Sequence, residues 1–440
     1  MIFNGQAFLG YQLPELLDIK KTKRIPLTIK QLDQWFSGLP LLNVHQLSSQ
    51  IPQYIYKINR LHMSDAQRFL ILERLRPTVD YLYDSIIKQM RGRSLYLSKE
   101  YRELEHLTRE LISGMAIGYQ RLLFNKSTQK SYFFSRRKYR LLAQRTMYYL
   151  GEQIRVSYML SMAVPKNIWK DFNVSYTLCI HSGLNKGNIT DEFAYHQNGK
   201  GSIDNLYHRI LLLAMISPYS LRNGELNQVY FALEPWLNHI KLTRKSEDHR
   251  HGYVIEIKND MGPIYVAGAR RKEQSFIIDN SKLLDKLKIW LESGVTPKSV
   301  DNKGMSTKLL THINVFLEHV RSFVSDNAAV SKIEANNDED FEAKNVWGRR
   351  LESSWDSHQF YESSAAPKLY YEQNRSEGRI KPSVRRHNFT IENESETSVC
   401  LSCNSLHGNG LCIGELMIIR SYNSDTWTLG VVLWMSLSDK

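Results

Sequence analysis

The sequence predicts an α+β protein with a helical N-terminal region, a small mixed middle section and an antiparallel β-rich C-terminal module. Apolar residues recur at helical spacing from about residue 28 to residue 239. Short β-branched and aromatic runs replace this pattern near residue 250, and similar runs end the chain after a stretch without periodicity. The expected sections are 1–245, 246–324, 325–388 and 389–440. A chain of 440 residues exceeds the usual size of one core, which favours several domains.

The helical region carries recognisable start signals. Thr28 followed by Gln31 has the capping-box spacing, and Ser64 with Gln67 repeats it. Pro77 is expected to begin the next helix. The apolar face predicted after Ser64 comprises Phe69, Leu70, Leu72 and Leu75.

Further helices are expected along the rest of this region, stacked against one another in antiparallel fashion. Their expected ranges are 101–124, 133–162, 168–179, 203–219 and 226–239. Residues 1–28 predict an irregular or weakly strand-like lead-in without a signal-peptide pattern. Residues 183–201, rich in Asn and Gly, predict a surface loop.

The middle section changes from helical to strand periodicity. Strands are predicted at Tyr253–Ile257, Ile264–Ala267 and Ser275–Ile278, because β-branched runs alternate there with turn residues. Helices are predicted at Ser281–Ser293 and Thr307–Phe323. The segment 325–388 then loses periodicity and contains an acidic run, which predicts a largely disordered insertion.

The C-terminal module contains four short strand candidates. They are His387–Ile391, Val399–Cys403, Ile413–Arg420 and Trp427–Met435. Asn423-Ser424-Asp425 predicts the hairpin turn between the last two strands. Period-two alternation assigns one inner face to Trp427, Leu429, Val431 and Leu433.

Composition and motifs argue against several function classes. The formal charge of +13 is dispersed in short clusters, which is typical of solvated faces rather than of a nucleic-acid stripe. Apolar runs are too short for a membrane span, and four Cys suggest a reducing, cytoplasmic compartment. Phosphate-binding loops, nucleophile elbows and zinc-protease helices are missing from the sequence. The sequence therefore predicts no catalytic activity, no catalytic residues and no cofactor.

One group of residues has the spacing of a metal site. Cys400, Cys403, His407 and Cys412 could hold tetrahedral zinc in a knuckle one residue shorter than the retroviral form. Such a knuckle would favour single-stranded nucleic acid as the partner. The alternative is that Cys400 and Cys412 are core residues of two strands, because each is flanked by aliphatic residues.

The C-terminal sequence also resembles the PilZ domain. The similar segments are Asn393–Leu401, Ile413–Leu416 and Trp427–Met435. Upstream segments resemble the PilZ proteins of gamma- and betaproteobacteria that have a long helical front. These segments are Ser64–Pro77, Asp204–Ala214, Pro218–Arg222 and Phe276–Asp279. The resemblance implies a C-terminal antiparallel β-barrel and a bacterial signalling receptor for cyclic di-GMP, linked to type IV pilus motility.

The resemblance also implies a ligand site built from a turn and preceding arginines. Such arginines grip phosphates and stack on guanine, and the turn supplies a hydroxyl and an acceptor to the base edges. The candidate ligand-binding residues are Asn393, Ser395 and Ser398 in the turn, with Arg321, Arg375 and Arg379 as the arginines. Asn393 and Ser398 stand where the family has Asp and Gly, so weakened binding is expected. The alternatives are the zinc-knuckle nucleic-acid binder and a ligand-free interaction scaffold, and the helical region is expected to contact a protein partner.

Overall fold

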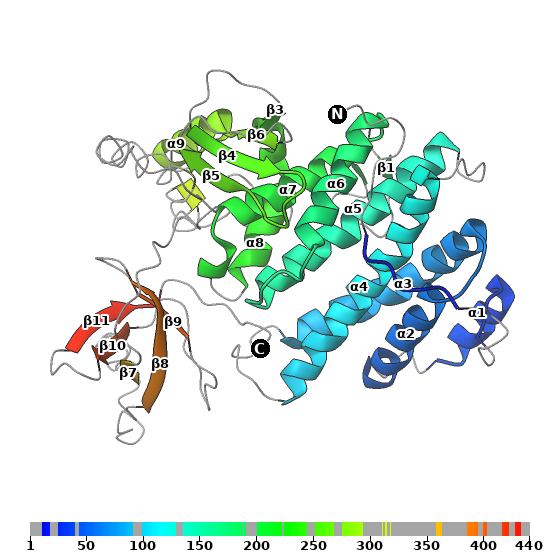
Figure 1. Ribbon diagram of the computed structural model, residues 1–440, viewed down its shortest axis with the longest axis horizontal. Helices are drawn as coiled ribbons and strands as arrows, with labels where there is room; N and C mark the ends of the chain where they lie inside the picture. The colour runs from blue at the N-terminus through cyan, green and yellow to red at the C-terminus, as the bar shows by residue number, and fades with distance from the viewer. Residues whose placement is uncertain are drawn as a thin grey trace, which may run out of the picture.

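The fold consists of a stack of helices, a small sheet on that stack and a second sheet from the C-terminal part of the chain (Figure 1). The computed structural model describes residues 11–17, 25–39, 44–90, 99–128, 135–187, 189–190, 200–221, 224–243, 251–267, 275–293, 310, 313–314, 317, 358–362, 385–394, 399–402, 416–421 and 427–432. Among these residues, no helix is long and apolar enough to cross a membrane.

The helical region follows the predicted pattern closely. Its α-helices are α1 (Ile29–Ser37), α2 (Val44–Asn59), α3 (Asp65–Met90), α4 (Lys99–Thr128), α5 (Arg136–Met159), α6 (Ile168–His181), α7 (Ile203–Met215) and α8 (Glu225–Ala232). Two 3₁₀ turns, η2 (Pro218–Ser220) and η3 (Glu234–His239), complete it. The loop between α6 and α7 contains two short strands, β1 (Ile189–Thr190) and β2 (Lys200–Gly201), which pair antiparallel.

Both predicted helix starts are confirmed. Thr28 caps α1 in a complete capping box with Gln31, and the backbone N–H of Gln67 donates to Ser64 Oγ at 3.2 Å. The expected helix start at Pro77 is wrong, because α3 continues through this residue. An interior proline removes one backbone hydrogen bond. The buried residues on both sides of Pro77 pack into one core and hold the helix together.

Close helix packing on α4 depends on small residues. A Cβ at Gly114 would lie 2.6 Å from Ile55 Cγ2 of α2, and one at Gly118 would lie 2.8 Å from Leu72 Cδ2 of α3. Leu72 is fully buried, whereas Leu70, predicted on the same face, is 51% exposed. Leu70 therefore lies on the solvent side of α3, and the predicted face was too wide by one residue.

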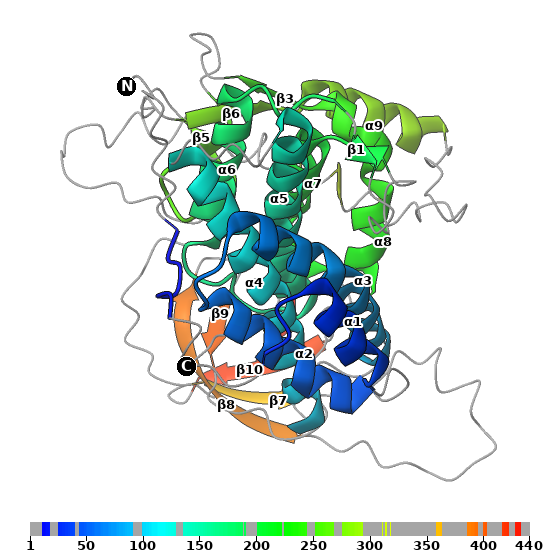
Figure 2. The same ribbon diagram turned by 90° about the vertical axis from the view of Figure 1, so that its right-hand side faces the viewer.

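A four-stranded antiparallel sheet follows the helices, in the order β3-β6-β4-β5. Its strands are β3 (Lys241–Thr243), β4 (His251–Glu256), β5 (Ile264–Ala267) and β6 (Ser275–Asp279), followed by α9 (Ser281–Ser293). Three of these strands and α9 were predicted, and β3 was not. Figure 2 shows this sheet and α9 covering the ends of α6 and α7. Aromatic rings join the layers, with Tyr176 against Phe276 and Trp236 stacked on Trp290.

The last sheet contains five antiparallel strands in the order β11-β10-β7-β8-β9. They are β7 (His358–Glu362), β8 (Arg385–Glu394), β9 (Val399–Ser402), β10 (Leu416–Ser421) and β11 (Trp427–Val431). All four predicted strands are present, and β10 and β11 pair as the expected hairpin. β7 lies within the stretch predicted to be disordered, most of which is outside the described residues. Closure into a barrel and the inner-face assignments stay predictions.

Candidate functional site

The predicted ligand-binding turn joins strands β8 and β9. Ile391 pairs with Leu401, and Asn393 pairs with Cys400, with a register shift between these two pairs. Such a β-bulge re-aims side chains and often lies beside a functional site. The next pair, Glu394 with Val399, closes the ladder, so residues 395–398 connect the two strand ends. The strand register thus fixes the position of Asn393 and of the two residues, Glu394 and Val399, at which the turn begins and ends.

Most other predicted site residues lie outside the part of the chain that the structure describes. These are Ser395 and Ser398 of the turn, and Arg321, Arg375 and Arg379. Leu310, Ile313 and Leu317, which precede Arg321, are buried in the core that the helical region shares with the four-stranded sheet and α9. Arg321 therefore follows a segment anchored in that core, whereas Asn393 belongs to the five-stranded sheet. The assembly of these residues into one pocket stays a prediction.

The zinc-knuckle residues are described only at Cys400. This residue lies within β9 and pairs with Asn393, as its interpretation as a strand residue requires. Cys403, His407 and Cys412 lie outside the described residues, so the metal set stays untested. Elsewhere, Cys179 is buried in α6, and burial raises the pKa of its thiol to about 12. That thiol is unreactive at neutral pH, because the thiolate is the reactive form.

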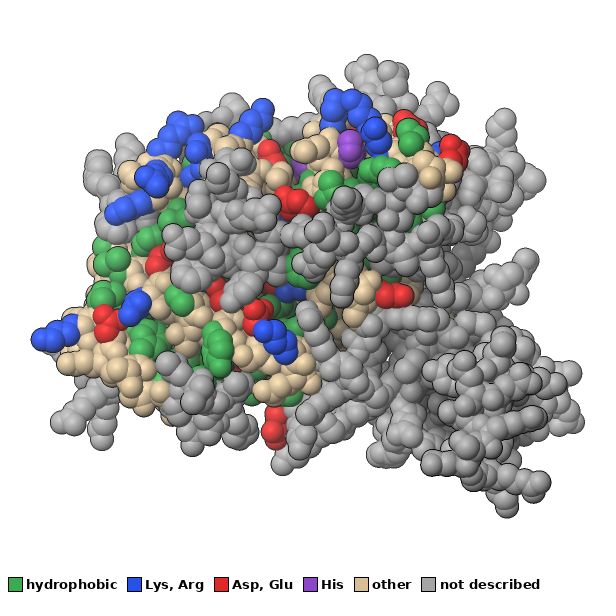
Figure 3. Space-filling view, turned by 180° about the vertical axis from the view of Figure 1, so that it is seen from behind, with side chains coloured by type: hydrophobic (Ala, Val, Ile, Leu, Met, Phe, Trp, Pro, Cys, Tyr) green, Lys and Arg blue, Asp and Glu red, His purple; other side chains and the backbone are tan. Residues whose placement is uncertain are grey.

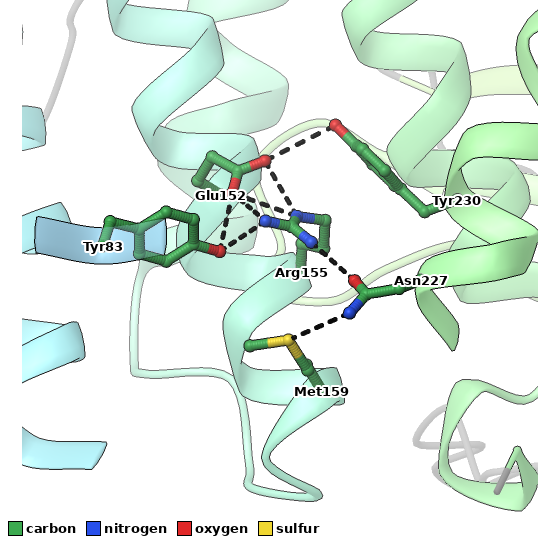
Figure 4. A network of polar contacts seen from close by, with 6 residues as sticks. All are labelled: Tyr83, Glu152, Arg155, Met159, Asn227 and Tyr230. Carbon is green, nitrogen blue, oxygen red and sulfur yellow. Dashed lines mark hydrogen bonds and ion pairs between the residues drawn. The ribbon is translucent and has the colours of Figure 1, made fainter. Parts of the chain in front are cut away.

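The described helices contain a buried polar network that local sequence patterns did not indicate (Figure 4). Glu152 and Arg155 lie one turn apart on α5 and form an ion pair of 2.6 Å between Oε2 and Nη2. Tyr83 of α3 donates to Glu152 Oε2 at 3.1 Å. From α8, Asn227 Oδ1 accepts from Arg155 Nη1 at 2.9 Å, and Tyr230 approaches Glu152 Oε1 at 3.5 Å. One network therefore ties α3, α5 and α8 together.

The electrostatics of this network favour a fixed ion pair. Burial alone would lower the pKa of Arg155, but the Glu152 carboxylate and neighbouring phenols raise it well above its usual value. Burial raises the pKa of Tyr83, so its hydroxyl remains protonated and can donate a hydrogen bond. Both members of the pair are almost fully buried. We infer a structural role, because an inaccessible and permanently paired carboxylate is not available for proton transfer.

A second, partly buried network crosses the middle of the stack. Glu73 of α3 accepts from Arg145 Nε and Nη2 at 3.1 and 3.2 Å, and from Tyr119 Oη at 2.6 Å. Tyr119 in turn stacks on Tyr149 of α5. Glu73 therefore joins α3, α4 and α5 through its two oxygens. The Glu73 side chain is 26% exposed, and these bonds pair its charge where the helices meet.

Comparison with known proteins identifies a family along most of the chain. The family description "Cyclic-di-GMP receptor FimW, N-terminal domain" matches residues 30–247, and "Cyclic-di-GMP receptor FimW, middle PilZ domain" matches residues 321–440. Among curated proteins, the cyclic-di-GMP receptor FimW of Pseudomonas aeruginosa is 27% identical over 213 residues. The aligned region covers 48% of this chain and 34% of that receptor, so it spans about a third of the relative's length. No solved structure matches.

Proposed function

This chain is a FimW-like PilZ protein, and we propose that it binds cyclic di-GMP at the turn between β8 and β9. The observation that supports the site is the register of these strands, which brackets residues 395–398 between Glu394 and Val399 beside a bulge. In this proposal, Asn393 and Ser395 contact the base edges, and Ser398 sets how closely the backbone approaches. The expected cost of Ser398 is weaker binding, because glycine permits a closer approach.

The cationic part of the proposed site comes from arginines. Cyclic di-GMP carries two phosphates, and desolvating them is unfavourable unless charged donors replace the lost water. The planar guanidinium suits both phosphate recognition and stacking on guanine. We assign this role to at least one of Arg321, Arg375 and Arg379. Binding is proposed to be non-enzymatic, with the ligand state passed to a protein partner through the helical region.

The proposal is tested by calorimetric titration of the full chain with cyclic di-GMP. Ser395→Ala is expected to weaken binding. At least one of Arg321→Ala, Arg375→Ala and Arg379→Ala, each tested alone, should weaken binding more than Ser395→Ala does. Arg137→Ala, which removes an exposed arginine of α5, is the matched control and should bind like the native chain. GMP in place of cyclic di-GMP tests whether the intact dinucleotide is required.

Two outcomes would contradict the proposal. The first is absence of heat at high ligand concentration from a chain shown to be folded by circular dichroism. The second is unchanged binding in all four site variants, which would place the ligand elsewhere. Stoichiometric zinc that is lost in Cys403→Ser would instead support the knuckle. Cytoplasmic location stays a prediction from the cysteine content, and type IV pilus motility stays a prediction from the family resemblance.

A further inference from the structure

A basic patch lies where the start of α5 meets the loop after α6. It consists of Arg136, Arg137, Arg140 and Lys186, of which all but the half-buried Arg140 are exposed. Figure 3 shows Lys and Arg side chains gathered along the upper edge of the molecule. The positive end of the α5 dipole adds to the same field. The patch therefore concentrates positive charge at one end of the helical region.

Two glycines in the loop make room for the arginines of this patch. Gly183 and Gly187 have φ of +62° and +99°, in the left-handed region that favours glycine. A Cβ at Gly183 would lie 3.3 Å from Arg136 Nη2, and one at Gly187 would lie 3.3 Å from Arg140 Nη1. Arg136 Nη2 also donates to the Gly183 carbonyl at 3.5 Å. The loop thus positions two guanidiniums one helical turn apart.

The charge of the patch is not neutralised by described carboxylates. Among the described residues, none of its four side chains forms an ion pair, and Arg140 Nε is buried without a hydrogen-bond acceptor. Asp204, a described carboxylate that bonds to this loop, already accepts from Tyr176 Oη at 2.7 Å and from Asn185 Nδ2 at 3.1 Å. These guanidiniums are held in place but are not paired with any described carboxylate. Their N–H groups are therefore open, partly preorganised donors for an anionic partner.

The surroundings of the patch distinguish between classes of anionic partner. The exposed large apolar side chains of the described residues lie elsewhere, so the part of the patch that the structure describes has no such side chain to insert into a membrane. Among the described residues that adjoin the patch, the aromatic residue is Tyr139, which is partly buried with Lys126 over its ring and is therefore no platform for stacking bases. The patch covers one helical turn and one loop, whereas duplex nucleic acid engages cations along its backbone. Carboxylates of a short acidic protein segment fit these limits best.

We infer that this basic patch is a docking surface for an acidic segment of a protein partner. Arg136 and Arg140 form bidentate bonds to carboxylates about one helical turn apart, and Arg137 and Lys186 add long-range attraction. This inference goes beyond the ligand site and does not depend on it, because none of the four residues belongs to the five-stranded sheet. It identifies the surface of the helical region that a protein partner would contact, and carboxylates as the groups that would bind there.

The test measures binding of a short, fluorescently labelled oligo-glutamate peptide to the full chain by anisotropy. Arg136→Glu with Arg140→Glu should weaken binding about tenfold or more, because the new carboxylates repel those of the peptide. The matched control is Lys282→Glu with Lys286→Glu on α9, which changes the net charge equally at two exposed lysines one turn apart. The control should bind nearly as the native chain does. Circular dichroism checks folding, and the neutral pair Arg136→Gln with Arg140→Gln provides a milder second variant.

The outcomes separate this inference from the ligand proposal. No binding of oligo-glutamate, or equal weakening in the patch and α9 variants, would overturn the docking surface. Binding of duplex DNA or of phosphatidylglycerol vesicles without binding of oligo-glutamate would overturn it too, in favour of another partner class. Cyclic di-GMP titration of the patch variants should match the native chain. A native chain that binds the peptide and not the dinucleotide would refute only the ligand proposal.

Discussion

The buried ion pair between Glu152 and Arg155 allows a quantitative prediction about stability. Its side chains are 1% and 4% exposed, and the N–O distance is 2.6 Å. The chain contains a matched pair on its surface, Arg74 with Asp33, at the same distance of 2.6 Å but with side chains 50% and 44% exposed. Arg155→Met and Arg74→Met therefore remove the same kind of partner at the same distance from a buried and from an exposed carboxylate. Arg155→Met also removes the hydrogen bond to Asn227.

The two substitutions should lower the free energy of unfolding by different amounts, because water can solvate the unpaired carboxylate only at the surface site. Arg155→Met leaves the Glu152 carboxylate buried without its cation, which should lower the free energy of unfolding by about 3–5 kcal/mol at neutral pH. Arg74→Met exposes Asp33 to water and should cost about 0–1 kcal/mol. Glu152→Gln combined with Arg155→Met should cost less than Arg155→Met alone, because no uncompensated charge remains. The difference measures the penalty for the orphaned carboxylate.

The pH dependence provides an independent check of the same reasoning. Without the cation, burial should raise the pKa of Glu152 in the folded Arg155→Met variant above its unfolded value of about 4.3. A folded-state pKa that lies above the unfolded one means that stability is lost as pH rises through it. The deficit of the variant against the native chain should therefore shrink as pH falls towards the unfolded value.

The assay is urea unfolding, followed by circular dichroism at several pH values for all four proteins. The slope against urea should be similar in each, so that the free energies can be compared. Equal losses in Arg155→Met and Arg74→Met at neutral pH would refute the argument from burial. A deficit for Arg155→Met that does not change with pH would refute the assignment of the penalty to the Glu152 charge.

Three further predictions concern single sites in the helical region. Burial raises the pKa of Asp171 to about 6, so the folded chain holds this proton more tightly than the unfolded chain. Unfolding free energy should then fall as pH rises from about 4 through that value, and Asp171→Asn should flatten this dependence in urea titrations. Gly118→Ala should lower stability in calorimetry, because overpacking against Leu72 costs about 1–3 kcal/mol, more than the helix-propensity gain of about 1 kcal/mol. A variant more stable than the native chain would contradict the close packing at this glycine. Asp260→Ala should cost about 0.5–2 kcal/mol in thermal unfolding, because its carboxylate accepts from two N–H groups at the start of α6; unchanged stability would show that this cap contributes nothing.

Local patterns predicted most helices, because their signals are short-range. The capping box at Thr28 is complete in the structure, and the helix start after Ser64 is equally clear. Pro77 misled the prediction, because a proline signal is local while its tolerance depends on tertiary packing. Leu72 and Val79, on either side of it, are both fully buried in the same core. Burial of one continuous face outweighed the lost backbone hydrogen bond.

The buried networks could not be found from the sequence in the same way. Glu152 and Arg155 have the i,i+3 spacing of an ordinary surface pair. Their burial follows from the position of α5, which contacts α4, α6, α7 and α8. The available signal was weak: α5 carries polar and apolar residues on every side, unlike a helix with one solvent face. Only the three-dimensional arrangement shows that these charges are paired inside.

The C-terminal sheet shows the same limit at longer range. Period-two patterns and turn residues predicted β8 to β11, because each pattern is local. β7 is a single five-residue strand, distant in sequence from its partners, and the lack of periodicity around it predicts disorder. Yet β7 pairs with β10 on one side and with β8 on the other, so among the described strands it alone joins the β8–β9 pair to the predicted β10–β11 hairpin. The scaffold of the proposed ligand turn therefore depends on a segment whose role only its pairing reveals.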